Sequence, residues 1–392
     1  MKRKRAVKQK TLPEDFRVEE LSGPLPPGGP YALYRLTKRG LGTPEAIDAV
    51  LRRWKIARAR VSYGGLKDRH AVTTQSVTIC RGPRRDLKQT SFELVYQGQV
   101  ARPFGPEDVL GNRFQIVLRN LSGADADRAR QGLAAVEHDG LPNYFDQQRF
   151  GSVGKSGDFV ARAWSAGDYE RALWLVLADP NSHDRPRQRA ERELVRRHWG
   201  DWPACQSALT RSPWRDVVAH LVDRPHDFRG ALARVRADLR SLHLASFQSF
   251  LWNRMLAELI RRRLRPEQWI DVSLGRYKLP FFRQLDGPQR ESLRGVELPL
   301  PSARVRKEEG PWKELVDRAL EPLGLSLDRL RIKYPRDSFF SKGSRAAVFF
   351  ARGLEHGVED DEVYPGRQRL TVRLELPRGC YATIVTRRIA LG

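Results

Sequence analysis

The feature that most constrains the fold of this chain is one carboxylate, Asp68, in a loop opened by two glycines. The loop has the sequence Gly64-Gly65-Leu66-Lys67-Asp68-Arg69-His70. Residues 58–63 before it and 76–79 after it alternate between apolar and polar side chains, which is typical of half-buried strands. Functional side chains often lie on loops held by such a scaffold. We therefore expect the Asp68 carboxylate at the tip of rigid structure.

The cations on either side of Asp68 give the loop its chemical character. Lys67 and Arg69 are expected to keep the carboxylate ionised, because nearby positive charge favours the charged form. An ionised carboxylate can act as a nucleophile, a base or an electrostatic stabiliser. Taken alone, such a string is more often a charged surface turn with glycine at its bend. The choice between these interpretations depends on the rest of the chain.

Other motifs accompany the Asp68 string along the chain. They are Pro13-Glu14-Asp15-Phe16-Arg17-Val18-Glu19-Glu20, Lys38 with Thr43, Gly111-Asn112-Arg113-Phe114 followed by Ile116-Val117-Leu118, Pro142-Asn143-Tyr144-Phe145 followed by Gln148-Arg149-Phe150-Gly151, and Leu376-Pro377-Arg378-Gly379-Cys380-Tyr381-Ala382-Thr383. With the Asp68 string, they resemble the signature of the TruD-type tRNA pseudouridine synthases. The resemblance spans nearly the full length, although residues 155–340 match it only thinly. In combination the motifs are specific, whereas singly only the Asp68 string is.

The resemblance implies an enzyme that isomerises uridine to pseudouridine in tRNA, at position 13. This reaction breaks the N-glycosidic bond, rotates the detached base and rejoins it through carbon. Asp68 is implied as the essential carboxylate, either attacking the sugar or assisting formation of a glycal-like intermediate. We expect no metal ion and no organic cofactor, because the rearrangement is redox-neutral and the sequence carries no cofactor motif.

The resemblance also implies how the nucleotide is held. The target base must leave its stack, so an aromatic partner and polar contacts to the base edge are expected. Phe145 is the implied stacking partner, and Asn143 is the implied polar contact to the nucleotide or to the Asp68 loop. The structural alternatives are a core aromatic ring and an amide that stabilises a turn.

Basic residues complete the expected substrate-binding set. Lys38 is implied to face the site, and Lys67 and Arg69 are expected to contact the substrate beside the reacting carboxylate. Arg149 either binds phosphate or anchors its own loop through a charge-assisted hydrogen bond. A solvated lysine is the structural alternative for Lys38.

Two residues depart from the family pattern. Asp146 stands where glycine is commoner, and Cys380 stands where a small hydroxyl residue is commoner. The added side chain and negative charge at Asp146 put the conformation of the loop around Phe145 in question. The change at Cys380 is milder.

The charge of the chain agrees with tRNA as the partner. The sequence has 71 Lys and Arg against 47 Asp and Glu, a formal net charge of +24 and a pI of about 10.5. Such an excess attracts polyanions, above all nucleic acid, and makes binding sensitive to salt. Residues 1–5, with Lys8 and Lys10, form a basic tail that is either a disordered end or an RNA-contacting arm. A nuclear import signal would have the same composition.

The sequence also bears on compartment and assembly. It has no apolar stretch long enough to span a bilayer and no recognisable signal peptide, so we expect a soluble protein without a membrane partner. Cys80, Cys205 and Cys380 are far apart, which favours a reducing compartment, the cytoplasm, over a disulfide scaffold. Their spacing does not fit a zinc site, and we expect buried apolar side chains. Nothing in the sequence demands more than a monomer.

The order of elements predicts an α+β fold. Strands are expected at residues 16–18 and 31–36, and Thr43 is the expected N-cap of the next helix. Another strand is expected at 114–118 and another helix at 125–136. The family resemblance makes this a pseudouridine-synthase-type mixed, mainly antiparallel sheet with flanking helices.

A largely helical insertion domain is expected to interrupt this sheet. Residues 158–240 are rich in Arg, Ala, Leu and Trp at helical spacing, and strand alternation returns at 347–350, 370–376 and 381–389. We therefore expect a catalytic domain at residues 1–154, a TruD-type insertion domain at 155–340, and the C-terminal part of the catalytic domain at 341–392.

One expected helix, residues 244–262, carries a polar stripe. Ser246, Ser249 and Asn253 fall at i, i+3 and i+7. Buried polar side chains are most often satisfied by protein groups. We therefore expect this stripe to serve packing and domain docking in preference to catalysis.

Three other functions compete with the isomerase. A phosphate-binding loop at residues 151–156 fails the Walker pattern, because Arg149 stands where the first glycine is required. A metal-dependent nuclease would need clustered carboxylates, and the acidic run 359–362 is expected to be a solvated loop. A tRNA-binding protein or RNA chaperone without chemistry explains the charge equally well. Only the Asp68 string argues against this last alternative.

Overall fold

The computed structural model describes residues 7–209, 211–305 and 312–391, so the basic run at residues 1–5 lies outside the described residues. The chain forms two compact units, one comprising the residues up to Leu141 with those from Phe349 onward, and the other Pro142–Val348. The chain thus leaves one unit, builds another and returns. The chain passes from the first unit to the second before residues 142–154. This loop is anchored within the second unit to helix α9 (Ala237–Arg263).

The first unit is built on one large sheet. Among the described residues this sheet has ten strands, and its main path runs β15-β16-β8-β2-β5-β3-β7-β6, with β1 added to β8 and β4 to β5. The pair β2 and β5 is parallel and the other pairs are antiparallel. The strands are β1 (Lys8–Gln9), β2 (Phe16–Ser22), β3 (Pro27–Arg39), β4 (Val61–Tyr63), β5 (Val72–Cys80), β6 (Leu87–Gln89), β7 (Phe92–Val100), β8 (Val109–Leu121), β15 (Arg352–Asp360) and β16 (Gln368–Pro377).

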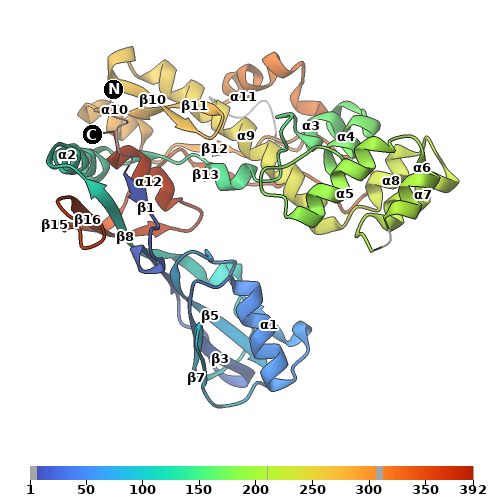
Figure 1. Ribbon diagram of the computed structural model, residues 1–392. Coiled ribbons are helices and arrows are strands. Elements are labelled where there is room, and N and C mark those ends of the chain that lie inside the picture. Colours follow the sequence, from blue (N-terminus) through green and yellow to red (C-terminus); the bar gives the residue numbers. More distant parts are fainter. Residues whose placement is uncertain (1–6, 210, 306–311, 392) are drawn as a thin grey trace. The chain divides into compact units, whose positions relative to one another are not determined.

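Helix α1 (Thr43–Trp54) covers the β3-β5-β7 part of this sheet (Figure 1). Its apolar side, including Ile47 and Val50, packs with Tyr34, Leu36 and Ile79 of the strands in one buried cluster. This is the amphipathic arrangement that the sequence predicts. The N-cap is Gly42 and not Thr43, so the helix begins one residue earlier than predicted. The Thr43 hydroxyl is used instead in the loop that carries Asp68.

Two further helices, α2 (Gly123–Asp139) and α12 (Ala382–Ile389), pack against each other beside β8 and β16. The prediction of a strand at residues 381–389 was therefore wrong. The β-branched residues of this segment favour a strand locally, but tertiary packing overrides that preference. Gly132 of α2 permits the close contact, because a Cβ atom there would lie 2.9 Å from the Cα of Ile389.

The second unit is largely helical, as predicted, with short hairpins added. Its strands pair as β10 with β11 and β12 with β13, both antiparallel. The α-helices are α3 (Val160–Ala166), α4 (Tyr169–Leu177), α5 (Pro186–Arg197), α6 (Trp202–Ala208), α7 (Arg215–Asp223), α8 (Phe228–Ala233), α9 (Ala237–Arg263), α10 (Gly287–Leu293) and α11 (Lys313–Leu320), and the strands are β10 (Trp269–Leu274), β11 (Tyr277–Phe282), β12 (Glu297–Pro299) and β13 (Ser344–Ala346).

Shorter elements fill the connections. Strands β9 (Leu141–Pro142) and β14 (Val348–Phe349) lie where the chain passes from one unit to the other. The 3₁₀ helices are η1 (Pro13–Asp15), η2 (Arg58–Arg60), η3 (Pro106–Asp108), η4 (Gln147–Phe150), η5 (Pro266–Gln268), η6 (Glu321–Leu323) and η7 (Leu327–Arg329). The segment before Asp68 is thus partly a 3₁₀ turn, and only Val61–Tyr63 is strand.

Helix α9 is the central support of the second unit, and its polar stripe serves packing. The Gln248 amide donates to the carbonyls of Pro301 at 3.0 Å and Ser341 at 2.8 Å. Asn253 uses both ends of its amide on the backbone of Phe145, at 2.9 and 2.8 Å. Within the stripe, protein groups thus satisfy Asn253, and the Ser249 hydroxyl donates to the Ala245 carbonyl at 2.7 Å, as the packing role requires. The buried Ser246 hydroxyl has no partner among the described residues.

Candidate active site

The Asp68 loop connects β4 and β5, which pair with each other in antiparallel fashion. Its entry depends on the absence of a side chain at Gly64. A Cβ atom there would lie 2.4 Å from the Val109 side chain and 2.9 Å from the Phe104 ring. Glycine is therefore required by close packing, and the loop leaves a rigid base as the sequence predicts.

Two buried polar side chains hold the backbone of the loop. The Thr43 hydroxyl donates to the Gln75 side-chain oxygen at 2.8 Å and accepts from the Lys67 backbone N–H at 3.0 Å. The amide nitrogen of Gln75 donates in turn to the Gly65 carbonyl at 3.0 Å. The start of α1 and the middle of β5 thereby fix the loop from two sides.

Lys38 holds the same loop at the backbone of Asp68 itself. Its side chain is only 1% exposed, and the ammonium donates to the carbonyls of Asp68 and Leu41, each at 2.7 Å. Burial lowers the pKa of Lys38 to about 8, although the charge of Asp68 opposes the shift. Lys38 lies at the site, as expected, but it positions the backbone and is neither solvated nor open to RNA.

The cation that contacts the Asp68 carboxylate is Lys10. The two side chains form an ion pair with 2.6 Å between Lys10 Nζ and Asp68 Oδ2, and each is 30% exposed. The Lys10 ammonium also lies 3.9 Å from the centre of the Phe16 ring, a cation–π distance. One oxygen of the carboxylate is thus engaged by a cation from the strand β1 region.

The charged groups of Lys67 and Arg69, expected to keep Asp68 ionised, make their contacts with other residues. The Lys67 ammonium points inward, 2.9 Å from Glu20 and 2.7 Å from the Asn112 side-chain oxygen, and is 10% exposed. Arg69 pairs with Glu45 at the surface. Residues adjacent in an irregular loop diverge, so sequence neighbours of Asp68 are not its contacts.

Sequence reasoning missed Lys10 as a site residue because it lies 58 positions from Asp68. It was assigned only to the basic tail. Its position just before the Pro13-Glu14-Asp15-Phe16 motif was the available signal, since that motif starts strand β2.

A basic groove lies on the sheet near the start of β5, the strand that follows the Asp68 loop. It has a volume of about 300 Å³, and Arg17, Arg35, Arg113 and Arg373 are among its lining residues. Glu19 pairs with two of these arginines, at 2.5 and 3.1 Å. Arg113 also contacts Glu375 at 2.7 Å and Arg373 contacts Glu355 at 4.0 Å, so carboxylates offset most of the positive charge of this groove.

The other expected site residues, Asn143, Phe145 and Arg149, belong to the second unit. The Phe145 ring is 8% exposed, with the Arg345 guanidinium 4.2 Å from its centre and Trp252 packed edge-on at 5.6 Å. The Asn143 amide donates to the Ala346 carbonyl at 2.9 Å and accepts from Arg345 at 2.5 Å. Within this unit, the Asn143 side chain therefore links its loop to strand β13.

Arg149 anchors its own loop. Its guanidinium donates to the Ser249 hydroxyl of α9 at 3.1 Å and lies 5.6 Å from the centre of the Phe145 ring. Asp146, which replaces the commoner glycine, has φ −82° and ψ 170°. Any residue adopts this backbone conformation, so the loop does not require glycine at this position.

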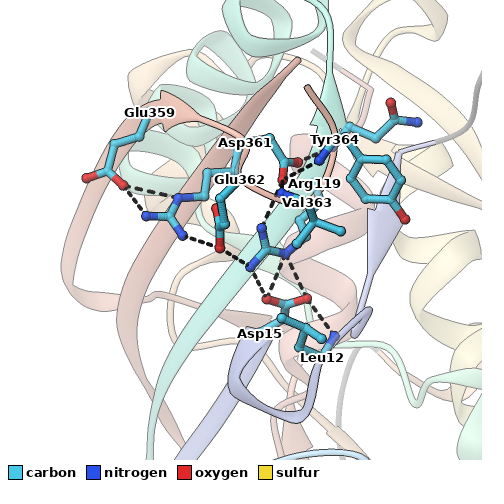
Figure 2. Close-up of polar contacts among 10 residues, drawn as sticks. Leu12, Asp15, Arg119, Glu359, Asp361, Glu362, Val363 and Tyr364 are labelled. Atoms are coloured by element: carbon cyan, nitrogen blue, oxygen red, sulfur yellow. Dashed lines mark hydrogen bonds and ion pairs between the residues drawn. The ribbon is translucent and has the colours of Figure 1, made fainter. Parts of the chain in front are cut away.

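Asp361 and Glu362 of the acidic run 359–362 form ion pairs with the buried Arg119 in the first unit (Figure 2). Arg119, 3% exposed, contacts Asp15 at 2.8 Å and both Asp361 and Glu362 at 2.9 Å. Asp361 is itself only 4% exposed. The prediction of a solvated loop was therefore wrong for Asp361, because this residue is a counter-ion of Arg119.

Hydrogen bonds shape the ionisation of this network. The bond with Glu362, followed by those with Asp15 and Asp361, raises the pKa of Arg119 against the opposing effect of burial. Burial opposes ionisation of Asp361, but backbone N–H groups of Asn120 and Val363 outweigh it and lower its pKa. The network is thus charged on both sides and structural in character.

No cluster of three or more His, Cys, Asp or Glu side chains suited to a metal ion occurs among the described residues. Within the same residues, no helix is both long and apolar enough to cross a membrane. Cys205 is fully buried, and burial raises the pKa of its thiol to about 11. Cys80 and Cys380 are only partly buried, so the expected burial holds for one cysteine.

Comparison with known proteins decides the family. The model of a protein family described as tRNA pseudouridine synthase D (TruD) matches residues 6–389, nearly the whole chain. The chain belongs to the TruD family. Membership confirms the resemblance drawn from the motifs, and it makes the protein an isomerase that converts uridine to pseudouridine in tRNA.

Relatives in the TruD family align over most of their lengths. A probable tRNA pseudouridine synthase D 2 of Methanocaldococcus jannaschii is 29% identical over 394 residues, which cover 98% of this chain and 92% of that protein. A probable tRNA pseudouridine synthase D of Methanopyrus kandleri is 30% identical over 387 residues, covering 96% and 89%. The tRNA pseudouridine synthase D of Aquifex aeolicus is 27% identical over 397 residues, covering 98% of each.

A solved structure shares the fold. The crystal structure of a putative tRNA pseudouridine synthase D (TruD) from Methanosarcina mazei matches with a TM-score of 0.73, over 98% of this chain and 93% of that one. The two sequences are 23% identical, so this likeness concerns the fold. It confirms the predicted α+β architecture with a mainly antiparallel sheet.

Proposed function

We propose that the protein isomerises uridine 13 of tRNA and that Asp68 is the reacting carboxylate. The observation that carries this assignment is how Asp68 is held. Buried side chains of Lys38, Thr43 and Gln75 fix the backbone of its loop, whereas the carboxylate remains 30% exposed. A rigid backbone that presents one accessible charged group is the preorganisation that catalysis requires.

The chemistry is balanced without any other reactant. The bond between C1′ of the ribose and N1 of the base breaks, and a bond between C1′ and C5 of the base forms. C5 loses its proton, and N1 gains a proton. Asp68 either adds to C1′ or removes a proton from the sugar to give a glycal, and both routes require its oxygen near the ribose. Lys10 occupies one carboxylate oxygen, Oδ2. The other oxygen is the one that we assign to the reaction.

The nucleotide contacts are part of the same proposal. We assign Phe145 to contact with the target base. Four other residues are assigned to substrate binding, which they support by holding their loops in place: Asn143, Arg149, Lys67 and Arg69. The Phe145 ring is mostly covered by protein, so a flipped base would contact its exposed edge. We further propose that the protein acts in the cytoplasm, as a monomer and without a metal ion.

Mapping pseudouridines in cellular tRNA, with and without this gene, tests the function. Loss of one pseudouridine at position 13 is expected in the deletion strain, restored by the wild-type gene and not by Asp68→Asn. The near-isosteric amide keeps the shape and removes the reactive charge, so purified Asp68→Asn should bind tRNA within a few-fold of wild type. Wild-type turnover by this variant would remove Asp68 from its role. If tRNA from the deletion strain keeps its pseudouridine at position 13, the assignment of that position is wrong.

A further inference from the structure

Two adjoining hollows in the second unit share the segment 328–340. The larger hollow, about 720 Å³, is lined by Arg304, Arg336 and Phe339 among others. The smaller, about 420 Å³, is lined among others by Trp164, Tyr169 and Arg329. Asp328, Arg331 and Lys333 line both hollows, so the two lie next to each other, and we call them together the 328–340 groove.

Positive charge predominates among the described residues that line this groove. In the described part of the chain, its lining includes five cations, Arg304, Arg329, Arg331, Lys333 and Arg336, and a single carboxylate, Asp328. All five cations are exposed, and within the described residues none of them forms an ion pair. Some other exposed arginines of this unit are paired, as Arg236 is with Asp238 and Arg265 with Glu267. Unpaired like charges crowded into one groove attract a polyanion.

Neutral groups in the groove add donors for such a ligand. Ser302 is 2% exposed, and its hydroxyl has no hydrogen-bond partner among the described residues. The buried hydroxyl of Ser165 in the smaller hollow has none there either. A buried hydroxyl normally has a partner. Phosphate oxygens, which accept hydrogen bonds and carry charge, would satisfy both the hydroxyls and the cations.

An exposed aromatic ring makes nucleic acid the best-fitting polyanion. Phe339 is 55% exposed, and the Arg304 guanidinium lies 5.5 Å from the centre of its ring. Proteins that bind unpaired nucleotides combine a basic groove along the backbone with aromatic rings on which bases stack. A small free anion would contact the cations but would leave the Phe339 ring exposed to water.

We propose that the 328–340 groove binds the phosphate backbone of tRNA, with Phe339 stacked on an unpaired base. The assignment rests on the proposed function for the identity of the substrate. It adds to the second unit a contact for the body of the tRNA, besides the residues of the first unit that hold the Asp68 loop. Arg331 and Lys333, which line both hollows, are its central phosphate ligands.

Binding of tRNA measured as a function of salt tests the proposal. The measurement uses full-length protein with Asp68→Asn, so that no turnover occurs. Replacing both Arg331 and Lys333 by alanine should lower affinity and reduce the slope of log affinity against log salt by about 2, one for each lost phosphate contact. Phe339→Ala should lower affinity about five-fold or more without changing the slope, because stacking is uncharged.

The matched control is the double variant Arg236→Ala and Arg265→Ala. It removes the same charge from exposed, ion-paired positions of the same unit and should leave the slope unchanged. If the Arg331 and Lys333 variant behaves like this control, the groove does not bind tRNA. If it loses only affinity for inorganic pyrophosphate, the groove is a site for small anions and the proposal is wrong. Arg336→Ala, at a third exposed position, replaces the double variant if that protein fails to fold.

The outcome is independent of the catalytic assignment. Pseudouridine formation is measured separately on wild-type protein that retains Asp68. If the wild-type protein forms no pseudouridine but the groove variants still bind tRNA more weakly than the control, only the proposed function is refuted. If the wild-type protein forms pseudouridine and the groove variants bind tRNA as the control does, only the groove proposal is refuted.

Discussion

Lys10 is the residue whose role follows most directly from geometry. Its ammonium donates to Asp68 at 2.6 Å, and a hydrogen bond between charged groups contributes about 1.5–3 kcal/mol. If Lys10 orients the carboxylate for reaction, Lys10→Gln should slow single-turnover conversion of bound tRNA by roughly ten- to a hundred-fold. Lys8→Gln, an exposed change of equal charge on β1, is the control. Equal rates for the two variants would show that Lys10 does not orient the Asp68 carboxylate and contributes only its charge.

The buried Lys38 predicts a pH dependence of stability. Its pKa is about 8 in the folded chain against 10.5 for an ordinary lysine, so between these values the unfolded chain binds more protons. The contribution of Lys38 to the free energy of unfolding should therefore rise with pH across this window, by at most about 1.4 kcal/mol per pH unit. Urea unfolding of wild type and Lys38→Met from pH 7 to 10.5 measures the difference. A difference that is flat in pH contradicts the prediction.

Phe145 can be tested against its own burial. If its exposed edge holds the target uridine, Phe145→Ala should slow single-turnover conversion far more than it weakens tRNA binding, and the defect should persist at every salt concentration. Stacking contributes about 1–3 kcal/mol per base and is uncharged. A sharply lowered melting temperature with an unchanged rate per folded molecule would instead assign the ring to packing against Trp252.

At the scale of elements, the Arg119 network ties strand β8 to the segments before β2 and after β15. Arg119→Met would leave Asp15 and Asp361 as buried, unpaired carboxylates, which should destabilise the protein by about 3–5 kcal/mol. Arg373→Met, which removes an exposed ion pair with Glu355 at 4.0 Å, should cost less than about 1 kcal/mol. Urea denaturation measures both. Similar midpoints would show that the network contributes little to stability.

Elements with a strong local pattern could be predicted, and those decided by tertiary contacts could not. Helix α1 and strands β3, β5, β8 and β16 follow from periodicity, which needs no knowledge of neighbours. Helix α12 does not, because its β-branched residues favour a strand and its helical form accompanies packing against α2. The same limit applies to the site. The motif pointed to Asp68, but its ion pair with Lys10 depends on how β1 and the loop meet in space.

At the scale of the whole molecule, the described residues offer no cluster that would hold a metal ion, and the proposed isomerisation uses none. Turnover of tRNA should therefore persist in excess EDTA at the wild-type rate. The assay should include a control that added magnesium restores any loss caused by unfolding of the tRNA itself. Metal-dependent strand cleavage, absent from Asp68→Asn, would favour a nuclease instead.

The split of the first unit between the two ends of the chain has a consequence for synthesis on the ribosome. Strand β8 has β16 as one neighbour, and Arg119 on β8 lies 242 positions before its counter-ion Asp361. At typical translation rates of 5–20 residues per second, β8 waits roughly ten to fifty seconds for that partner. During this time one side of β8 exposes unpaired backbone groups, and near its end Pro142–Val348 is complete and free to fold. The newly made chain should therefore depend most on chaperones after its insertion has folded and before its last strand emerges.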